Sequence, residues 1–222
     1  MRDQVFADRR DAGRQLARLL GEYAGRDDAV VLGLARGGVP VAFEVARAIG
    51  VPLEVFTVRK IGVPGQEELA MGAIASGGAV VMNYPVVDGL GITPTRFDLA
   101  AERETVELER REVAYRGDRP PLDLEGKAAI LVDDGLATGT TMRAAVRAVR
   151  ELGPEEVVVA VPTAPAAACR ELAAIVDEVV CLSVPRHMDA VGQSYLDFAQ
   201  TSDDEVRALL AAADSGQDDP AF

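Results

Sequence analysis

The sequence predicts an α/β fold built on a doubly wound, mainly parallel β-sheet. Short apolar runs such as 30–34, 128–133 and 157–161 recur along the chain. Strands that are buried on both faces of a parallel sheet have this composition. Helical patterns separate the runs, and an alternation of strands and helices is typical of a sheet with helices on both faces. The 222 residues, 49% of them hydrophobic, are enough for one such core.

The first elements of the chain alternate in this way. Residues 8–24 carry an apolar stripe, which predicts an amphipathic helix, and 30–34 form the first strand. A helix is expected over 40–49, because Pro40 suits the first turn of a helix. A second strand is expected over 53–58.

The middle of the chain is less regular. Residues 60–70 lack periodicity and contain glycine and proline, which predicts a mobile loop. The apolar runs 71–75 and 80–82 lie on either side of a Ser-Gly-Gly sequence and predict a hairpin. A long charged helix is expected over 93–116, starting at a Thr-Pro pair and ending before Arg119-Pro120-Pro121.

The last part of the chain returns to the alternating pattern. A surface helix is expected after the strand at 128–133, followed by strands at 157–161 and 179–182 with a short helix between them. We interpret residues 1–213 as a single domain. The last nine residues, 214–222, are expected to be a disordered acidic tail.

Composition and charge argue against several classes of protein. The net charge is −13, which disfavours nucleic acid or an anionic membrane as a general partner. Residues 201–222 hold six acids and one arginine, whereas 33–62 hold four bases and two acids. No apolar run approaches the ~20 residues that span a bilayer, and the charged N-terminus lacks a signal-peptide segment. Two cysteines, Cys169 and Cys181, are too few for a disulfide scaffold, so a cytoplasmic location is expected.

Two adjacent acids, Asp133 and Asp134, stand at the carboxyl end of a predicted buried strand, where open α/β sheets bind ligands. Residues 137–141 then provide little side-chain bulk, several hydroxyls and the N–H groups of a helix start. Such a loop can hold a phosphate. The acids could instead only cap the next helix. Together, the acids and the loop suit a sugar that has free hydroxyls and a phosphate at one end.

The segment 130–141 resembles the phosphoribosyl pyrophosphate signature of the type I phosphoribosyltransferases. The resemblance implies a sheet of that family's kind with a small hood, and displacement of pyrophosphate from C1 of the donor by an acceptor nitrogen. It implies that Asp133 and Asp134 are catalytic and hold the ribose hydroxyls. The residues implied to bind the 5′-phosphate and ribose are the same two acids with Ala137, Thr138, Gly139, Thr140 and Thr141.

Magnesium is the cofactor that the resemblance implies. We expect Mg²⁺ to arrive with the substrate, with Asp133 and Asp134 as its candidate protein ligands. The single histidine rules out a His-rich zinc site, and no dedicated metal-ligand cluster is present in the sequence.

A second ligand-binding sequence, Leu34-Ala35-Arg36-Gly37-Gly38, follows the first strand. Glycines let the backbone approach a ligand, and the arginine can bind an anion, although an ordinary turn with a surface arginine has the same pattern. The resemblance identifies this segment as the pyrophosphate loop, with contacts from Ala35, Arg36 and Gly37 and a catalytic role for Arg36. It also implies a cis peptide bond between Ala35 and Arg36.

Further residues are implied at the edges of the site. Arg59 and Lys60 lead into the expected loop, which in the family folds over pyrophosphate; they could equally be a solvated strand end. The hood over the acceptor is expected from about 183–200 and the N-terminal helix. Its candidate acceptor contacts are His187, Tyr195 and Phe198, although the two aromatics could simply anchor the end of the chain to the core.

The acceptor is the least determined part of the function. Enzymes of this class that act on 6-oxopurines carry an aspartate where this chain has Ala137, and its loop is more similar to the adenine type. Over nearly its whole length the chain also resembles a family of bacterial predicted phosphoribosyltransferases with an unassigned acceptor. A homodimer is compatible with this resemblance.

Two other classes of function remain open at this level. A regulator of the same fold would bind phosphoribosyl pyrophosphate or a nucleotide without turnover. A phosphohydrolase could use the acidic pair, but the sequence contains no Gly-x-Ser-x-Gly, Walker or His-Glu-x-x-His motif.

Overall fold

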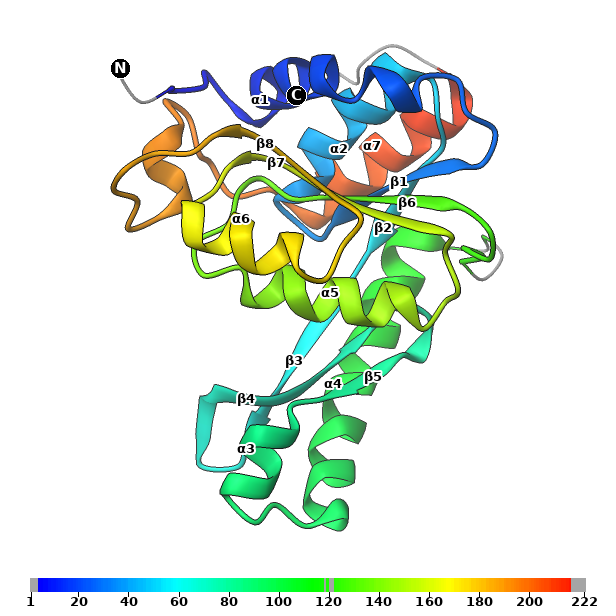
Figure 1. Cartoon of the computed structure of the whole chain (residues 1–222). Coiled ribbons are helices and arrows are strands. Elements are labelled where there is room, and N and C mark those ends of the chain that lie inside the picture. Colours follow the sequence, from blue (N-terminus) through cyan, green and yellow to red (C-terminus); the bar gives the residue numbers. More distant parts are fainter. Residues whose placement is uncertain (1–3, 118, 120–121, 217–222) are drawn as a thin grey trace.

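A parallel sheet forms the centre of the molecule (Figure 1). The structure is a computed structural model that describes residues 4–117, 119 and 122–216. In this part of the chain, five parallel strands pair in the order β2-β1-β6-β7-β8. Their bounds are β1 (Ala29–Leu34), β2 (Leu53–Phe56), β6 (Ala128–Val132), β7 (Glu156–Thr163) and β8 (Glu178–Ser183).

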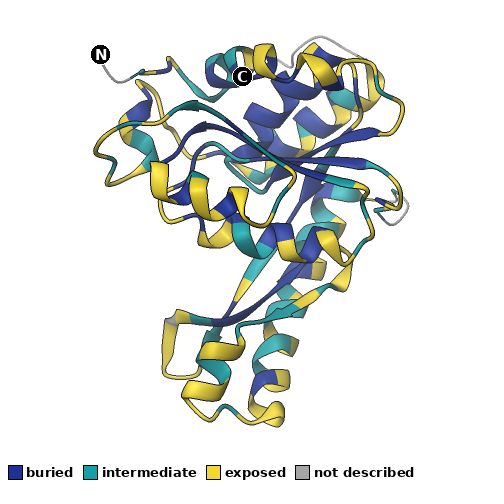
Figure 2. Cartoon of the chain, in the orientation of Figure 1, coloured by how far each residue is buried: buried dark blue, intermediate teal, exposed yellow. Residues whose placement is uncertain are grey.

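Helices cover both faces of this sheet, which confirms the doubly wound α/β fold. One face packs against α1 (Arg9–Leu16), α2 (Gly38–Ile49) and α7 (Asp203–Ser215). The other face packs against α5 (Thr140–Arg150) and α6 (Ala166–Ala173). Burial is concentrated in the strands and in the helix faces turned towards them (Figure 2). The continuous apolar strands therefore lie where their composition places them, between two layers of helix.

The N-terminal helix is shorter than expected. The Asp8 side chain caps α1 by accepting a hydrogen bond from the Asp11 N–H at 2.7 Å. The α-helix ends at Leu16, and two 3₁₀ turns follow, η1 (Ala17–Leu19) and η2 (Gly21–Tyr23). Because glycine is a weak helix former, Gly21 favours the change from α-helix to looser turns.

The loop expected over 60–70 is instead a β-hairpin. Strand β3 (Val58–Val63) pairs antiparallel with β4 (Gln66–Ala75), which pairs with β5 (Val80–Met82). The strand expected over 53–58 is correspondingly divided, because β2 ends at Phe56 and Val58 begins the second sheet. The glycine at position 65 has φ +84° in the hairpin turn, and one at position 62 lies where the two strands cross closely. These glycines suggested a loop, but they serve a tight hairpin.

The hairpin belongs to an arm, residues 58–116, that projects from the central sheet (Figure 1). The arm also contains α3 (Tyr84–Gly89) and α4 (Pro94–Arg116), and the long helix agrees with the one expected over 93–116. Pro120 and Pro121, expected to follow it, lie outside the described residues. A small apolar core holds the arm together: Ile61, Val63, Met71, Ile74, Phe97 and Leu108.

The acidic C-terminal stretch is partly helical. Ser202 caps α7 by accepting a hydrogen bond from the Glu205 N–H at 3.1 Å. The three acids of the first turn suit the positive end of the helix dipole. The disorder expected from Asp214 is wrong for the start of that segment, because α7 continues to Ser215. Residues 217–222 lie outside the described residues.

Candidate functional site

The two acids of the signature lie side by side at the carboxyl end of β6. The Asp133 Oδ1 atom accepts a hydrogen bond from the Asp134 N–H at 2.9 Å. The Asp134 Oδ2 atom is 2.8 Å from Nε of Arg9, which lies in the first turn of α1. Both side chains of this ion pair are largely buried, with 12% of Arg9 and 13% of Asp134 exposed. Arg9 is a site residue that the sequence did not indicate.

The acids differ in electrostatic environment. Burial and the neighbouring Asp134 carboxylate raise the pKa of Asp133 well above its usual value. Burial also raises the pKa of Asp134, but the Arg9 guanidinium opposes that rise. Asp134 is therefore the carboxylate whose charge is directly compensated by the protein.

The loop after β1 touches the acids. A Cβ atom added at Gly37 would clash with the Asp134 Oδ2 atom, and one added at Gly38 would lie 2.6 Å from the Val132 carbonyl oxygen. Only glycine permits this approach. The Ala35–Arg36 peptide bond is cis, which confirms the expectation. The two segments that the sequence singled out thus form one surface.

The Arg36 side chain forms an ion pair with an acid of another element. Its Nη1 atom lies 3.5 Å from Oδ1 of Asp203, the first residue of α7. The Tyr115 hydroxyl of α4 donates a hydrogen bond to the same Asp203 oxygen at 2.7 Å. This hydrogen bond, followed by the charge of Arg36, lowers the pKa of Asp203. Arg36 is thereby paired with an acid of its own chain.

The expected phosphate loop leads into α5. Gly139 has φ +70° at the N-cap of α5, and the side chains at 137, 138, 140 and 141 are exposed. The hydroxyls of Thr138 and Thr140 lie 3.0 Å apart. The loop therefore presents hydroxyls and a helix N-terminus to solvent, which is an arrangement that suits an anion.

A cation in the first turns of α5 reaches this loop. Arg143 donates hydrogen bonds to the Thr138 carbonyl at 2.9 Å and to the Thr140 hydroxyl at 3.1 Å, and it pairs with Glu171 of α6 at 2.7 Å. The spacing Thr140 to Arg143, i and i+3 on one helix, is the signal that could have indicated this contact.

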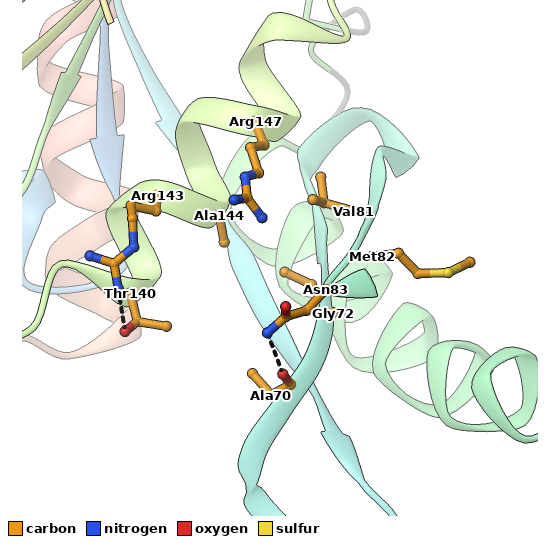
Figure 3. Close-up of a pocket in the computed structure, with 10 residues that line it drawn as sticks. Ala70, Gly72, Val81, Met82, Asn83, Thr140, Arg143, Ala144 and Arg147 are labelled. Atoms are coloured by element: carbon orange, nitrogen blue, oxygen red, sulfur yellow. Dashed lines mark hydrogen bonds between the residues drawn. The ribbon is translucent and has the colours of Figure 1, made fainter. Parts of the chain in front are cut away.

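A cavity of about 650 Å³ connects the phosphate loop with the arm. Its polar lining includes Lys60 and Asn83 of the arm with Thr138, Thr140, Thr141 and Arg143. Figure 3 shows the adjoining cavity, where Arg143 turns towards Thr140 and Arg147 extends between α5 and the arm. The structure thus brings Lys60 to the loop, whereas the guanidinium of Arg59 pairs with Glu104 of α4 at 2.6 Å.

The candidate hood residues lie in different surroundings. Tyr195 is buried with its ring 5.5 Å from that of Phe6, and its hydroxyl donates a hydrogen bond to the Asp134 carbonyl at 2.5 Å. Phe198 is 37% exposed, and the guanidinium of Arg9 stacks 3.9 Å from its ring centroid. His187 is exposed and makes no hydrogen bond or ion pair within the described part of the chain. Tyr195 therefore contacts Asp134 directly, and Phe198 contacts the Arg9 side chain that pairs with this acid.

Comparison with known proteins shows which family the chain is similar to. The family model for the phosphoribosyl transferase domain matches residues 2–197. The chain belongs to this family. The match extends from the N-terminal segment that carries Arg9 to the segment that carries Tyr195, and so includes both loops and the acids.

A relative found by sequence and another found by structure support the assignment to this family. A Mycobacterium tuberculosis protein, provisionally named a phosphoribosyl transferase, is 49% identical over 210 residues, which are 95% of this chain and 47% of that protein. The chain therefore spans about half the length of the curated relatives it matches. The crystal structure of the Thermus thermophilus protein TT1426 is 45% identical, has a TM-score of 0.82, and covers 93% of this chain and 98% of its own. Together with the family match, this likeness confirms the type I phosphoribosyltransferase fold.

The phosphoribosyl transferase family implies a magnesium ion, and the acid pair suits one. Hard divalent cations prefer carboxylate oxygens, and Mg²⁺ commonly uses one or two carboxylates together with substrate phosphates. No group of three or more metal-binding side chains gathers within the described residues. A cation bound to Asp133 or Asp134 would offset the repulsion between the two carboxylates. Among the described residues, no helix is long and apolar enough to cross a membrane.

Proposed function

We propose that this chain transfers the phosphoribosyl group of phosphoribosyl pyrophosphate to a nitrogenous, nucleobase-like acceptor. The observation that carries the proposal is the approach of Gly37 to the Asp134 carboxylate. This approach puts a candidate pyrophosphate loop on one side of the acids, while the loop 137–141 follows them in the chain. A donor with a hydroxyl-bearing ring and phosphates on both sides of it suits these three parts.

In the proposed reaction, the bond from ribose C1 to a pyrophosphate oxygen breaks and a bond from C1 to the acceptor nitrogen forms. Pyrophosphate leaves with the electron pair, and the acceptor loses a proton. Because the transition state resembles an oxocarbenium ion, the site must position both reactants and stabilise the leaving charge. Mg²⁺ bound with the donor, and to Asp133 or Asp134, would supply part of that stabilisation.

Different residues of the chain bind the ribose, the 5′-phosphate and the pyrophosphate of the donor. Asp133 and Asp134 accept hydrogen bonds from the ribose hydroxyls, and residues 137–141 bind the 5′-phosphate through N–H and hydroxyl groups. Gly37 donates its backbone N–H group to pyrophosphate, whereas the Ala35 N–H already donates to the Phe56 carbonyl at 3.1 Å. Arg36 and Lys60 add positive charge, which requires Arg36 to exchange Asp203 for the ligand. Arg59 would similarly have to leave Glu104.

The acceptor is the open part of this proposal. Ala137 is exposed beside the acids and has no group that could exchange a proton with a base. We therefore expect 6-oxopurines to be poor acceptors. An acceptor would enter beside Phe198, a partly exposed aromatic ring that stacks on the Arg9 guanidinium paired with Asp134.

The test is pyrophosphate release from phosphoribosyl pyrophosphate and Mg²⁺ in the presence of a panel of nitrogenous bases. Release that depends on one base would identify the acceptor. The variants Asp133→Asn and Asp134→Asn should lose donor binding, whereas Asp88→Asn on the exposed surface of α3 should not. Unchanged donor binding in both site variants would show that the assignment is wrong.

A second candidate function is a regulator that binds the same donor or a nucleotide without turnover. One observation favours it: Arg36 and Arg59, both expected at pyrophosphate, are each paired with an acid of the chain. Tight donor binding without pyrophosphate release on any base would support the regulator over the enzyme.

A further inference from the structure

Segments from the two ends of the family match meet beside the acids. Residues 6–9 and 194–199, here called the terminal brace, are joined by three backbone hydrogen bonds. The Phe6 N–H donates to Ser194 at 2.8 Å, the Leu196 N–H to Phe6 at 2.8 Å and the Asp197 N–H to Ala7 at 2.9 Å. The fully buried Phe6 ring packs against Tyr195. The brace is therefore an ordered part of the fold.

Each segment of the brace holds a different atom of Asp134. Arg9, from the first segment, donates from Nε to the carboxylate. Tyr195, from the second, donates from its hydroxyl to the main-chain carbonyl of the same residue. Burial raises the pKa of the Tyr195 hydroxyl, so the group stays a donor. Side-chain and backbone positions of Asp134 are thus fixed independently.

Arg9 also joins the two segments to each other. Its Nη1 atom donates to the Ala199 carbonyl at 2.6 Å, and its guanidinium stacks on Phe198. One carboxylate oxygen of Asp134, Oδ1, has no partner among the described residues. That oxygen can accept a hydrogen bond from a ligand, while Arg9 occupies the other.

We propose that the terminal brace positions Asp134 for donor binding through Arg9 and Tyr195. Both are positioning residues, because they act on the acid and need no contact with the donor. The inference rests on the proposed function, since it assumes that Asp134 binds phosphoribosyl pyrophosphate. It adds that residues outside both ligand loops set the affinity of the site.

The experiment compares donor binding by calorimetry, with Mg²⁺, in wild-type protein and two variants. Arg9→Gln removes the charge-assisted hydrogen bond and should weaken binding about 10- to 100-fold. Tyr195→Phe keeps the ring against Phe6 and should weaken it about 2- to 10-fold. Arg9→Lys retains the charge and should recover part of the loss, which a merely structural role would not predict.

Matched controls are available elsewhere in the chain. Arg18→Gln removes an exposed arginine just beyond α1, and Tyr84→Phe removes the hydroxyl of an exposed tyrosine in the arm; neither should change donor affinity. Thermal unfolding checks that each variant is folded, and Tyr195→Phe tests the inference even if Arg9→Gln unfolds.

The outcomes separate the two proposals. Wild-type protein that binds the donor, with wild-type affinity in both Arg9→Gln and Tyr195→Phe, would overturn the brace alone. Wild-type protein that does not bind the donor would overturn the proposed function and the brace inference with it. Weaker binding in both variants, with partial recovery in Arg9→Lys, would support the brace and the donor-binding part of the proposed function.

Discussion

The Asp203 carboxylate lies 3.5 Å from the Arg36 guanidinium, across the gap between α7 and the loop that follows β1. Tyr115 holds the same carboxylate from the arm. One acid therefore links the arm, the C-terminal helix and the candidate pyrophosphate loop. In the proposed function, this acid competes with pyrophosphate for Arg36.

Asp203→Asn should therefore strengthen the binding of pyrophosphate and of the donor. The ion pair is partly exposed, so a gain of about two- to fivefold is expected from the usual worth of such pairs. Pyrophosphate titration in the absence of acceptor measures it. Asp204→Asn is the control, because Asp204 pairs with Arg207 on the surface. Weaker binding in Asp203→Asn would mean that Asp203 helps to orient Arg36 instead.

Gly37→Ala should disrupt the acid pair directly. The added methyl group would clash with the Asp134 carboxylate, so either the loop or the acid must move. We expect at least about a tenfold loss of donor affinity and a cost in stability of about 1–3 kcal/mol. Calorimetry and chemical denaturation measure the two effects. Gly21→Ala meets no atom within 4 Å and should be neutral; equal behaviour of the two variants would contradict the close contact.

Asp133→Asn should stabilise the protein without ligand at neutral pH. The folded-state pKa of Asp133 is raised above the unfolded value of 3.8. At a pH between these two pKa values, the native state therefore holds a proton that the unfolded state has released. Stability therefore falls as pH rises through that window, and the ionised acid destabilises the fold above it. Asparagine does not ionise, so the Asp133→Asn variant does not lose this stability as pH rises.

Thermal unfolding across pH measures this effect. Each kcal/mol gained in the free energy of unfolding should raise the melting temperature by about 2–4 °C in a protein of this size. The difference between variant and wild type should shrink as pH falls towards the unfolded-state pKa. Asp88→Asn, on the exposed surface of α3, should show no such trend. A variant that is less stable than wild type at neutral pH would contradict the prediction.

Arg143→Gln should weaken binding of the 5′-phosphate group. The guanidinium contacts both Thr138 and Thr140, so its loss removes a cation and loosens the loop. About a tenfold lower affinity for ribose 5-phosphate is expected, in line with one charge-assisted interaction. Arg150→Gln, two turns along the same helix, is the control because Arg150 pairs with Asp177 away from the loop. Equal affinities would leave Arg143 a purely structural partner of Glu171.

Local patterns predicted the central sheet and the position of the two acids at the carboxyl end of β6. Continuous apolar strands such as β6 and β7 leave few alternatives to a buried parallel sheet, and the acids after β6 could be assigned from their place in that sheet. The cis bond before Arg36 followed from family resemblance alone.

Long-range packing accounts for what the sequence did not reveal. The arm hairpin has glycines at its turn and crossing, and its strands are recognisable only when Phe97 and Leu108 of α4 cover them. Arg9 is 125 positions from the acid it contacts, and no local spacing signals such a pair. Arg143, by contrast, lies three residues from its partner Thr140 and could have been inferred.

The terminal brace also has a consequence for the order in which the site is assembled during synthesis. A chain emerging from the ribosome presents Arg9 early and the acids later, whereas Tyr195 emerges only after all five strands of the central sheet. A domain generally folds as a unit during synthesis. The site is therefore completed only when residues 194–199 have emerged and can pair with residues 6–9.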